Sequence, residues 1–434
     1  MRRMWGIAIG LLLLLLALGG VLRWLSLSPR FVSNQQLLAE LATIDLPEPT
    51  LPPATAWPQW RGPTREGAVA ATTLRNDWAD LKPRWKQPGG EGYSSFALRD
   101  GLAWTMLERD GQEEIVCLDL ATGEPKWQHR YSPEKKFDYG GPRATPTIEG
   151  DDLFTVSSDG RVMRMSASKG DVIWEVPLGL PAPRWGFAAS PLVRENQVFA
   201  AGVAFDRETG SRLWGLSDAP GYSSPVLLRL STPGQGIETQ VLFFAGTHLV
   251  GVRADDGAER WRISWPTFSQ VNAATPVVIP ARGAHSNFAY VFISSGYGKG
   301  SALVKVAWER DRPAARLVYQ TTELCCHFAS PVRVGEHLYA LDEERDLTCL
   351  EIRTGQVKWR QRGFRKGSLI CIGDRLLILG ETGNLALVKA NPEEYEEITK
   401  ARPFRDRSWA LPAFANGQLL LRDRRLMVLY DLTP

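Results

Sequence analysis

Two adjacent cysteines followed by a histidine are the residues of this chain best suited to redox chemistry. The stretch TTELCCHFASPV, residues 321–332, contains Cys325, Cys326 and His327. Neighbouring cysteines can close a strained disulfide, which would be labile to reductants. Free cysteine is also among the most buried residue types, so two reduced residues beside a strand are the alternative. For His327 the alternatives are a ligand and a hydrogen-bonded wall residue.

The remaining cysteines and histidines predict neither a disulfide framework nor a metal site. The count of cysteines is odd, and no two have the Cys-x-x-Cys spacing of zinc and redox motifs. Only five histidines are present, and none are paired as His-x-x-x-His. The five cysteines are Cys117, Cys325, Cys326, Cys349 and Cys371.

Composition indicates a large all-β chain with many turns. The 434 residues are 44% hydrophobic and include 40 Gly and 16 Trp. Short valine- and leucine-rich runs between turn residues are typical of strands. The net charge is only +3, from 51 basic and 48 acidic side chains, which gives no reason to expect a nucleic-acid partner.

The N-terminus carries a membrane signal in residues 1–27. Arg2 and Arg3 precede an uncharged run from Met4 to Leu22, about the length of a membrane-spanning helix. The basic start favours retention of this end in the cytoplasm, so the sequence predicts a single-pass anchor with the rest on the periplasmic side of the inner membrane. The alternative is a cleaved signal peptide at the poor small-x-small site of Ala17–Gly19, followed by secretion to the periplasm.

Residues 28–56 are predicted to be a spacer. Ser33 or Asn34 could cap a short helix over QQLLAELA. The four prolines of LPEPTLPPATA then favour an extended, semi-rigid stalk.

A repeat fills residues 57–434. Five segments end in Trp with Gly four residues earlier, and the spacings between these Trp residues are 47, 40, 47 and 98. The last spacing equals two repeats with one Trp lost. A Ser-Pro or Thr-Pro pair, such as Ser190-Pro191, precedes the strand-like runs of most repeats. The Trp residues are 127, 174, 214, 261 and 359.

This period predicts an eight-bladed β-propeller of four-stranded blades. The glycines supply the positive φ of tight hairpins, and each Trp should lie on an outer strand and pack between blades. The eighth unit, Trp409 to Pro434, has three strands, and its fourth should come from LKPRWKQ near Trp85, which closes the ring. The other blades are expected at 93–130, 142–178, 185–218, 221–265, 271–321, 327–363 and 367–404.

The repeat resembles the PQQ-type repeat, the blade of quinoprotein alcohol dehydrogenases and of the outer-membrane assembly lipoprotein BamB. The sequence is also similar to bacterial PQQ-like propeller proteins, through WPQWRGPTREG (57–67), GYSSPV (221–226), VNAATPVV (271–278), VFISSGYGKG (291–300) and KWRQRGFRKGSL (358–369). The resemblance covers about residues 57–434 and implies the fold more firmly than any chemistry.

The resemblance also implies what an enzyme of this family requires. A quinone needs flat walls, a Ca²⁺ needs several oxygen ligands, and an Asp base must lie near the reactive carbonyl. The family's vicinal disulfide forms one wall and belongs to the first blades, whereas Cys325-Cys326 begins blade six. The acidic residues of this chain lie mainly in repeat turns such as LDLATG, which are surface positions.

The residues that precede each inner strand form the best candidate binding site. Inner strands line the central channel, so these side chains should meet at one mouth of it, where an aromatic and basic rim suits a planar or anionic ligand or a peptide. The alternative is that they pack on one another and plug the channel. The predicted rim residues are Tyr93, Arg143, Arg184, Trp185, Phe187, Tyr222, Asn272, His327 and Trp409.

These observations predict a membrane-anchored, monomeric and non-catalytic binding scaffold of the bacterial envelope, with envelope proteins as partners and no cofactor. Propeller faces are broad and carry loops, which suits protein partners. The first alternative is a quinone-dependent oxidoreductase with PQQ and Ca²⁺, implied by the resemblance alone. The second is a carbohydrate or polymer binder that uses exposed aromatic side chains.

Overall fold

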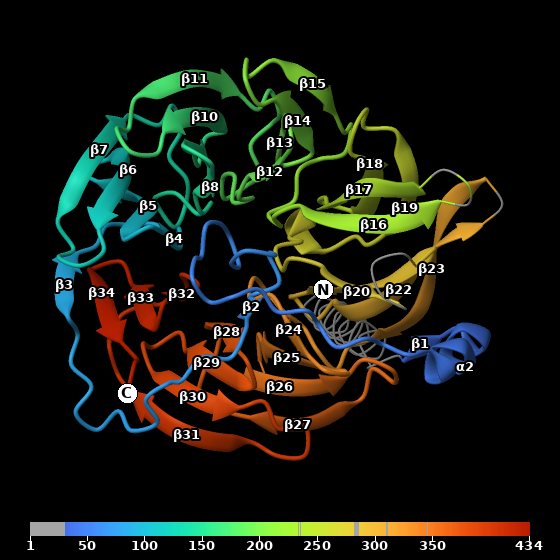
Figure 1. Ribbon diagram of the computed structural model, residues 1–434. Helices are drawn as coiled ribbons and strands as arrows, with labels where there is room; N and C mark the ends of the chain where they lie inside the picture. Colours follow the sequence, from blue (N-terminus) through green and yellow to red (C-terminus); the bar gives the residue numbers. More distant parts are fainter. Residues whose placement is uncertain (1–30, 233, 235, 282–285, 310, 345) are drawn as a thin grey trace, which may run out of the picture.

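Eight β-sheets surround a central axis in the computed structural model (Figure 1). The structure describes residues 31–434 except 233, 235, 282–285, 310 and 345. Each sheet contains the four strands of one blade, in sequential order in all blades but the last, which confirms the predicted eight-bladed propeller. Within these described residues no helix is long and apolar enough to span a membrane. The predicted anchor, Met4 to Leu22, lies outside them.

The first four blades follow one another along the chain, each from the inner to the outer strand. Blade 1 contains β4 (Ala97–Arg99), β5 (Leu102–Arg109), β6 (Gln112–Asp119) and β7 (Pro125–Tyr131). Blade 2 contains β8 (Thr147–Glu149), β9 (Asp152–Val156), β10 (Arg161–Ser166) and β11 (Val172–Pro177). Blade 3 contains β12 (Leu192–Arg194), β13 (Gln197–Ala200), β14 (Val203–Asp206) and β15 (Arg212–Gly215). Blade 4 contains β16 (Val226–Thr232), β17 (Gly236–Phe244), β18 (His248–Arg253) and β19 (Glu259–Ser264).

The remaining blades complete the ring. Blade 5 contains β20 (Val277–Pro280), β21 (Phe288–Ser295), β22 (Gly300–Glu309) and β23 (Arg312–Thr321). Blade 6 contains β24 (Val332–Val334), β25 (His337–Asp342), β26 (Asp346–Glu351) and β27 (Val357–Gln361). Blade 7 contains β28 (Ser368–Ile372), β29 (Arg375–Leu379), β30 (Leu385–Lys389) and β31 (Glu396–Ala401). Blade 8 contains β32 (Ala413–Ala415), β33 (Gln418–Arg422), β34 (Leu426–Asp431) and β3 (Trp85–Pro88).

Strand β3 closes the ring, as the sequence predicted. It pairs antiparallel with β34, and Trp85 lies opposite Leu429. The outer strand of blade 8 therefore comes from the N-terminal side of the chain, and the inner three strands come from the C-terminus. This arrangement removes the open edge that a linear stack of blades would have.

The outer-strand tryptophans join neighbouring blades. The Trp127 ring covers Gly170 of the next blade, where a methyl group would lie 2.6 Å from the ring, and its Nε1 donates to the Ala167 carbonyl at 3.0 Å. Tyr319 takes the place of the missing Trp in blade 5, because it covers Gly355 and its hydroxyl donates to the Ile352 carbonyl. The prediction that these aromatic residues pack between blades is confirmed.

The hydroxyl groups of the Ser/Thr-Pro pairs link the inner strands, a role that the sequence did not reveal. The Thr145 N–H donates to Ser190 Oγ at 2.8 Å, and the Ser190 N–H donates to Ser224 Oγ at 2.9 Å. The Thr275 N–H donates to Ser330 Oγ at 2.8 Å in the same way. Each hydroxyl thus satisfies a buried backbone donor of the preceding blade.

Residues 31–56 of the predicted spacer lie on the propeller. Strand β1 (Val32–Ser33) pairs with β23, and helix α2 (Gln35–Thr43) follows. As predicted, Asn34 caps the helix, and its Oδ1 accepts from the Leu37 N–H at 3.2 Å. Leu37 and Leu41 are buried against blades 5 and 6 because they share one helix face.

The proline-rich part is extended as expected but is bound along its length. The Arg333 guanidinium donates to the Pro47 carbonyl at 2.6 Å. The Ala70 N–H donates to the Pro52 carbonyl, and the Asn416 N–H donates to the Ala54 carbonyl. These hydrogen bonds hold the proline-rich part on the propeller up to residue 57, where the chain enters the central channel.

Candidate functional site

The central channel is filled from one side by residues 57–69, which we call the plug (Figure 1). The Trp57 backbone exchanges two hydrogen bonds with Leu98 of blade 1, and the Pro58 carbonyl accepts from Ile148 of blade 2. Trp60 Nε1 donates to Thr275 Oγ1 of blade 5 at 3.0 Å. The plug then ends as strand β2 (Ala68–Val69), which pairs parallel with β28 of blade 7.

Two buried arginines hold the plug to opposite sides of the channel. Arg61 donates to the carbonyls of Ser330 and Pro331 in blade 6, and also to the Arg65 and Glu66 carbonyls. Arg65 donates to the carbonyls of Ser190 and Pro191 in blade 3. Burial lowers the pKa of Arg61 to about 10 and that of Arg65 to about 9, so both remain cationic at neutral pH.

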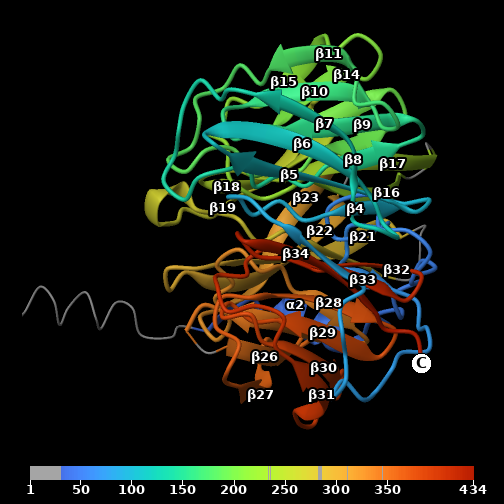
Figure 2. The same ribbon diagram turned by 90° about the vertical axis from the view of Figure 1, so that its left-hand side faces the viewer.

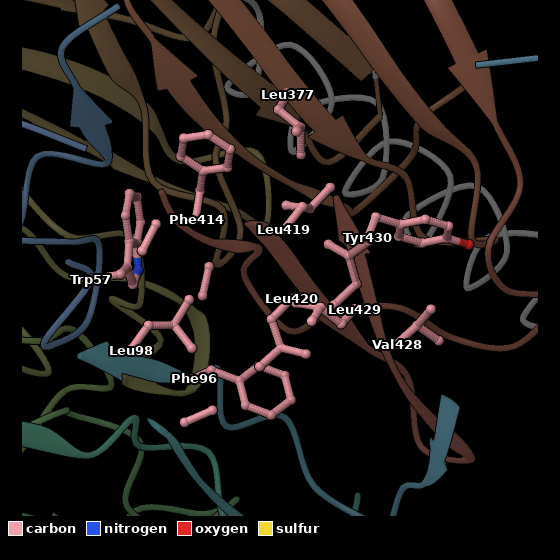
Figure 3. Packing of buried hydrophobic residues seen from close by; sticks show 14 of the residues in the cluster. Trp57, Phe96, Leu98, Leu377, Phe414, Leu419, Leu420, Val428, Leu429 and Tyr430 are labelled. Atoms are coloured by element: carbon pink, nitrogen blue, oxygen red, sulfur yellow. The ribbon is translucent and has the colours of Figure 1, made fainter. Parts of the chain in front are cut away.

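The plug also contributes to the apolar core. Trp57 is fully buried in the same cluster as Leu98 of blade 1 and Phe414 of blade 8 (Figure 3). These contacts lie further along the inner strands than the predicted rim residues. The plug therefore closes the channel at the face of the propeller opposite the predicted rim residues. We call the face that carries the rim residues the rim face.

All nine predicted rim residues lie in the connections on the rim face, but two of them are structural. Phe187 is fully buried between blades and lies against Gly160. Asn272 is also fully buried, and its amide donates to the carbonyls of Ala245, Gly246 and Trp265. Phe187 and Asn272 therefore stabilise the blade ends and do not line a surface. The seven others are Tyr93, Arg143, Arg184, Trp185, Tyr222, His327 and Trp409.

A continuous aromatic cluster covers the mouth of the channel. Trp409 is its centre, with ring centroids 5.1 Å from Tyr93, 5.9 Å from Tyr139 and 5.0 Å from Phe328. From Phe328 the ring contacts continue through His327 and Tyr297 to Phe268. We call these seven rings, with Trp409 at their centre, the aromatic cluster. Side chains of six connections thus pack on one another, which is the alternative considered for the predicted rim.

Sequence reasoning missed Tyr139, Phe328, Tyr297 and Phe268. Phe328 is adjacent to His327, and Tyr139 and Phe268 lie in connections to inner strands, as predicted rim residues do. Phe268 belongs to the short 3-10 helix η1 (Phe268–Gln270), and Tyr297 lies in the turn between β21 and β22. A search for aromatic residues in these connections would have identified the four residues.

Basic side chains lie on the aromatic cluster and on a separate aromatic pair, Trp185 and Tyr222. The Arg407 guanidinium is 4.4 Å from the Trp409 ring centroid and 5.4 Å from that of Tyr139. Arg184 lies 5.0 Å from the Trp185 ring, and Trp185 packs on Tyr222 at 6.0 Å. Cations over ring faces are held by the ring quadrupole. The mouth is therefore an aromatic surface with positive charge.

Arg143 has a supporting role. Its guanidinium donates to the carbonyls of Asp138, Tyr139 and Gly141, which fixes the loop that carries Tyr139. A cavity of about 220 Å³ lies under this loop. Lys135, Lys136 and Glu108 all line it, so its charge is mixed and it selects no class of ligand.

His327 is held neutral at the edge of the cluster. The Lys366 ammonium donates to His327 Nδ1 at 3.0 Å, which requires an unprotonated nitrogen there. Burial, and secondarily the charge of Lys366, lower the pKa of His327 to about 4.

This depressed pKa predicts a loss of stability in mild acid. Between about pH 6.5 and pH 4 the unfolded chain binds a proton that the folded chain does not, so the free energy of unfolding falls as pH decreases through this window, by up to about 3 kcal/mol. Urea unfolding of the wild type and of His327→Gln at pH 7 and pH 4.5 measures it. The variant should lose less stability than the wild type, and equal losses would contradict the assignment.

The cysteine pair is buried, and the five cysteines, all of them among the described residues, form no disulfide. Cys326 is fully buried in the core of blades 5 and 6. The Cys326 N–H donates to Ser294 Oγ, and the Cys325 N–H donates to Asp342 Oδ2. Burial raises the pKa of the Cys326 thiol, so it is a poor thiolate.

The residues at the mouth do not fit a quinone with Ca²⁺. Within the part of the chain that the structure describes, no three Asp, Glu, His or Cys residues are grouped to hold a metal. Nearby carboxylates are engaged: Glu381 accepts from Trp409 Nε1 at 3.0 Å, and Glu343 accepts from the Gly298 N–H. The aromatic faces already cover one another, and the buried thiols offer no flat wall. No reaction step is therefore assigned to such a group.

Comparisons with known proteins agree with the fold. The model of the family described as "Outer membrane protein assembly factor BamB" matches residues 111–361. The protein of this name from Yersinia pestis is 20% identical over 360 residues, which are 76% of this chain and 85% of that protein. Quinohemoprotein alcohol dehydrogenase ADH IIB of Pseudomonas putida is 25% identical over 172 residues, 35% of this chain but 24% of that enzyme.

Solved structures are similar in fold alone. A europium-containing methanol dehydrogenase aligns with a TM-score of 0.55 and 11% identity, over 89% of this chain and 91% of that one. The computationally designed Ika8 protein aligns with a TM-score of 0.51 and 12% identity, over 82% of this chain and all of that one. At these identities the propeller architecture is shared, and the sites must be compared residue by residue.

Proposed function

The chain belongs to the family of the outer membrane protein assembly factor BamB, and we propose that it is a non-catalytic binding scaffold of the bacterial cell envelope. The observation that supports this proposal most is the aromatic cluster. It is a surface of packed rings and cations on a closed, plugged ring of blades, and surfaces rich in aromatic residues and arginine are typical of protein-binding hot spots.

We also propose where the scaffold resides. The uncharged run from Met4 to Leu22 would hold it on the periplasmic side of the inner membrane as a single-pass anchor, with a cleaved signal as the alternative. The relatives named as outer membrane assembly factors favour an envelope protein as the partner. The broad aromatic cluster suits a peptide segment or loop of such a partner better than a small molecule.

Removal of Trp409 should weaken partner binding by roughly tenfold or more, because its ring contacts three others and is a hot-spot candidate.

A photoreactive residue placed at Tyr297 in cells should capture a discrete envelope protein, and the same residue at Ile237 on the opposite face should not. Both positions are exposed, at 41% and 46%.

The captured protein is then purified, and its affinity for the wild type, Trp409→Ala and Tyr222→Ala is measured. Melting temperatures show whether each variant is folded. Unchanged affinity in folded Trp409→Ala would contradict binding through the aromatic cluster, and unchanged affinity in folded Tyr222→Ala would contradict a contribution of the Trp185–Tyr222 pair.

The quinone-dependent oxidoreductase is disfavoured by the residues at the mouth, although part of the chain is similar to such an enzyme. Titration with PQQ and Ca²⁺, followed by quinone absorbance and melting temperature with and without reductant, separates the two functions. Tight binding that raises the melting temperature would favour the enzyme, and loss of that binding on reduction would implicate Cys325 and Cys326.

A further inference from the structure

The exposed aromatic side chains gather on one face of the propeller. Among the described residues, the exposed large aromatic side chains are Phe31, Tyr139, Phe268 and Tyr297, at 50%, 50%, 67% and 41%. The last three lie in connections of the rim face. The exposed aliphatic side chains of Ile173, Leu213 and Ile237 lie instead near turns of the opposite face. A single aromatic face of this kind is typical of interfacial contact with a bilayer.

Phe31 lies on the same face. Strand β1 pairs antiparallel with β23, and Val32 lies opposite Gln320, one residue before the end of β23. Since outer strands end at the rim face, Phe31 is at that face. Figure 2 shows the described chain beginning at the side of the propeller where the loop of η1 projects.

Two loops of the rim face are strongly basic. Residues 362–367 and 402–409 contain six basic side chains and one acidic side chain, Asp406. Arg362, Arg365, Arg402 and Arg405 are exposed and have no ion pair among the described residues. Asp406 pairs with Arg424 and Arg425, so it does not neutralise these four.

The opposite face carries the acidic turns. Asp119 and Asp206, for example, accept hydrogen bonds from backbone N–H groups in the turns that precede the outer strands. The described chain therefore presents a basic, aromatic face and an opposite face with acidic turns. An anionic surface would attract the first face selectively.

We propose that the rim face lies on the surface of an anionic phospholipid bilayer, with Phe31, Tyr139, Phe268 and Tyr297 at the interface and Arg362, Arg365, Arg402 and Arg405 over the headgroups. Chain length supports this orientation. Eight residues lie between Leu22 and Phe31, and the nine Cα–Cα steps of this link span at most about 30 Å when it is extended. Outer strand β23, with ten residues, is itself about 33 Å long. The anchor is thus attached at the rim face by a link that is shorter than the outer strand is long.

This inference rests on the proposed membrane location and makes it more specific. Anionic membranes attract polybasic segments, and interfacial aromatic residues add to this binding. A partner bound at the aromatic cluster would then be a protein segment at the membrane surface.

The test measures how close each face is to the lipid. The full chain is reconstituted into vesicles of phosphatidylcholine with phosphatidylglycerol, as Phe268→Cys or Ile237→Cys labelled with a fluorophore. All five native cysteines are buried, so labelling is selective for the introduced residue. Headgroup-nitroxide lipids should quench the label at 268 roughly threefold more than the label at 237. The charge variant Arg362→Glu/Arg365→Glu/Arg405→Glu should lose roughly half or more of the quenching at 268.

The matched control reverses three exposed basic residues away from the rim face, Lys82→Glu/Lys169→Glu/Lys358→Glu, and should leave quenching at 268 unchanged. Equal quenching at 268 and 237, absence of quenching at 268, or equal effects of the two charge variants would overturn the inference. A carbonate wash reports separately on the anchor. If the label at 268 is quenched but the wash removes the protein, the rim-face contact is supported and the anchor is refuted. If the wash leaves the protein bound but the label at 268 is not quenched, the anchor is supported and the rim-face contact is refuted.

Discussion

Replacement of Arg61 by Met should lower the free energy of unfolding by about 3 kcal/mol or more, because four buried carbonyl groups lose a charged donor. Two of these carbonyls, those of Ser330 and Pro331, belong to blade 6 and the other two to the plug. Met keeps the aliphatic length of the side chain, so the loss arises from the guanidinium. Urea unfolding at neutral pH measures it.

Two further variants make this result specific. Arg61→Lys keeps the charge, but one ammonium cannot serve both pairs of carbonyls, so its loss should be intermediate. Arg229→Met changes an exposed arginine of β16 that has no ion pair among the described residues, and it should alter stability by less than about 0.5 kcal/mol. A similar small change in Arg61→Met would show that the plug contributes little to the stability of the ring.

Replacement of Trp85 by Ala should have the second large effect, about 3–5 kcal/mol of unfolding free energy. The Trp85 ring covers Gly123, where a methyl group would lie 2.6 Å from it, and Nε1 donates to the Leu120 carbonyl at 2.9 Å. Trp85 also lies on the strand that closes the ring. Its loss should therefore expose both β3 and β34 to proteolysis.

Trp174→Ala is the matched comparison. Trp174 packs on Gly210 and donates to the Arg207 carbonyl at 2.9 Å, but it lies on β11, within a single blade. It should lose similar stability without faster cleavage near β3. Cleavage of both variants at the same sites and rates would mean that closure depends on backbone pairing rather than on Trp85.

The blades could be predicted from the sequence because their signals are local. A Gly before a tight turn and a Trp four residues later, as in Gly170 and Trp174, mark the same hairpin in successive repeats. The closing strand could be predicted because the eighth unit contains only three strands. Tyr319 was not recognised because it replaces a Trp by a residue of similar shape and hydrogen-bonding capacity.

The plug and the bound N-terminal segment could not be predicted, because their partners are distant in sequence. Arg61 hydrogen-bonds residues 269 and 270 positions away, and no periodic pattern marks such a contact. The segment WPQWRGPTREG was recognised only as a point of family resemblance. Proline-rich sequence indicated an extended chain, and the carbonyls at Pro47 and Pro52 show that an extended chain can be bound throughout.

The rim prediction was partial for a physical reason. The repeat places one residue before each inner strand, but it does not determine which side chain of the connection turns outward. Phe187 turned inward between blades, and Tyr139 and Phe328 joined Trp409 instead. Side-chain direction in a loop depends on local hydrogen bonds, such as those of Arg143, that a repeat does not encode.

The plug has a consequence for the order of events during synthesis. It leaves the ribosome before any blade, yet its hydrogen-bonding partners include residues of blades 6 and 7, which are made more than 250 residues later. Contacts of such sequence separation are slow to form, because a long loop must close first. Until the last blade is made, the early blades therefore have an unfilled channel and an open edge. Exposed edges favour aggregation. Nascent chains of this propeller should consequently depend on chaperones until the last blade emerges.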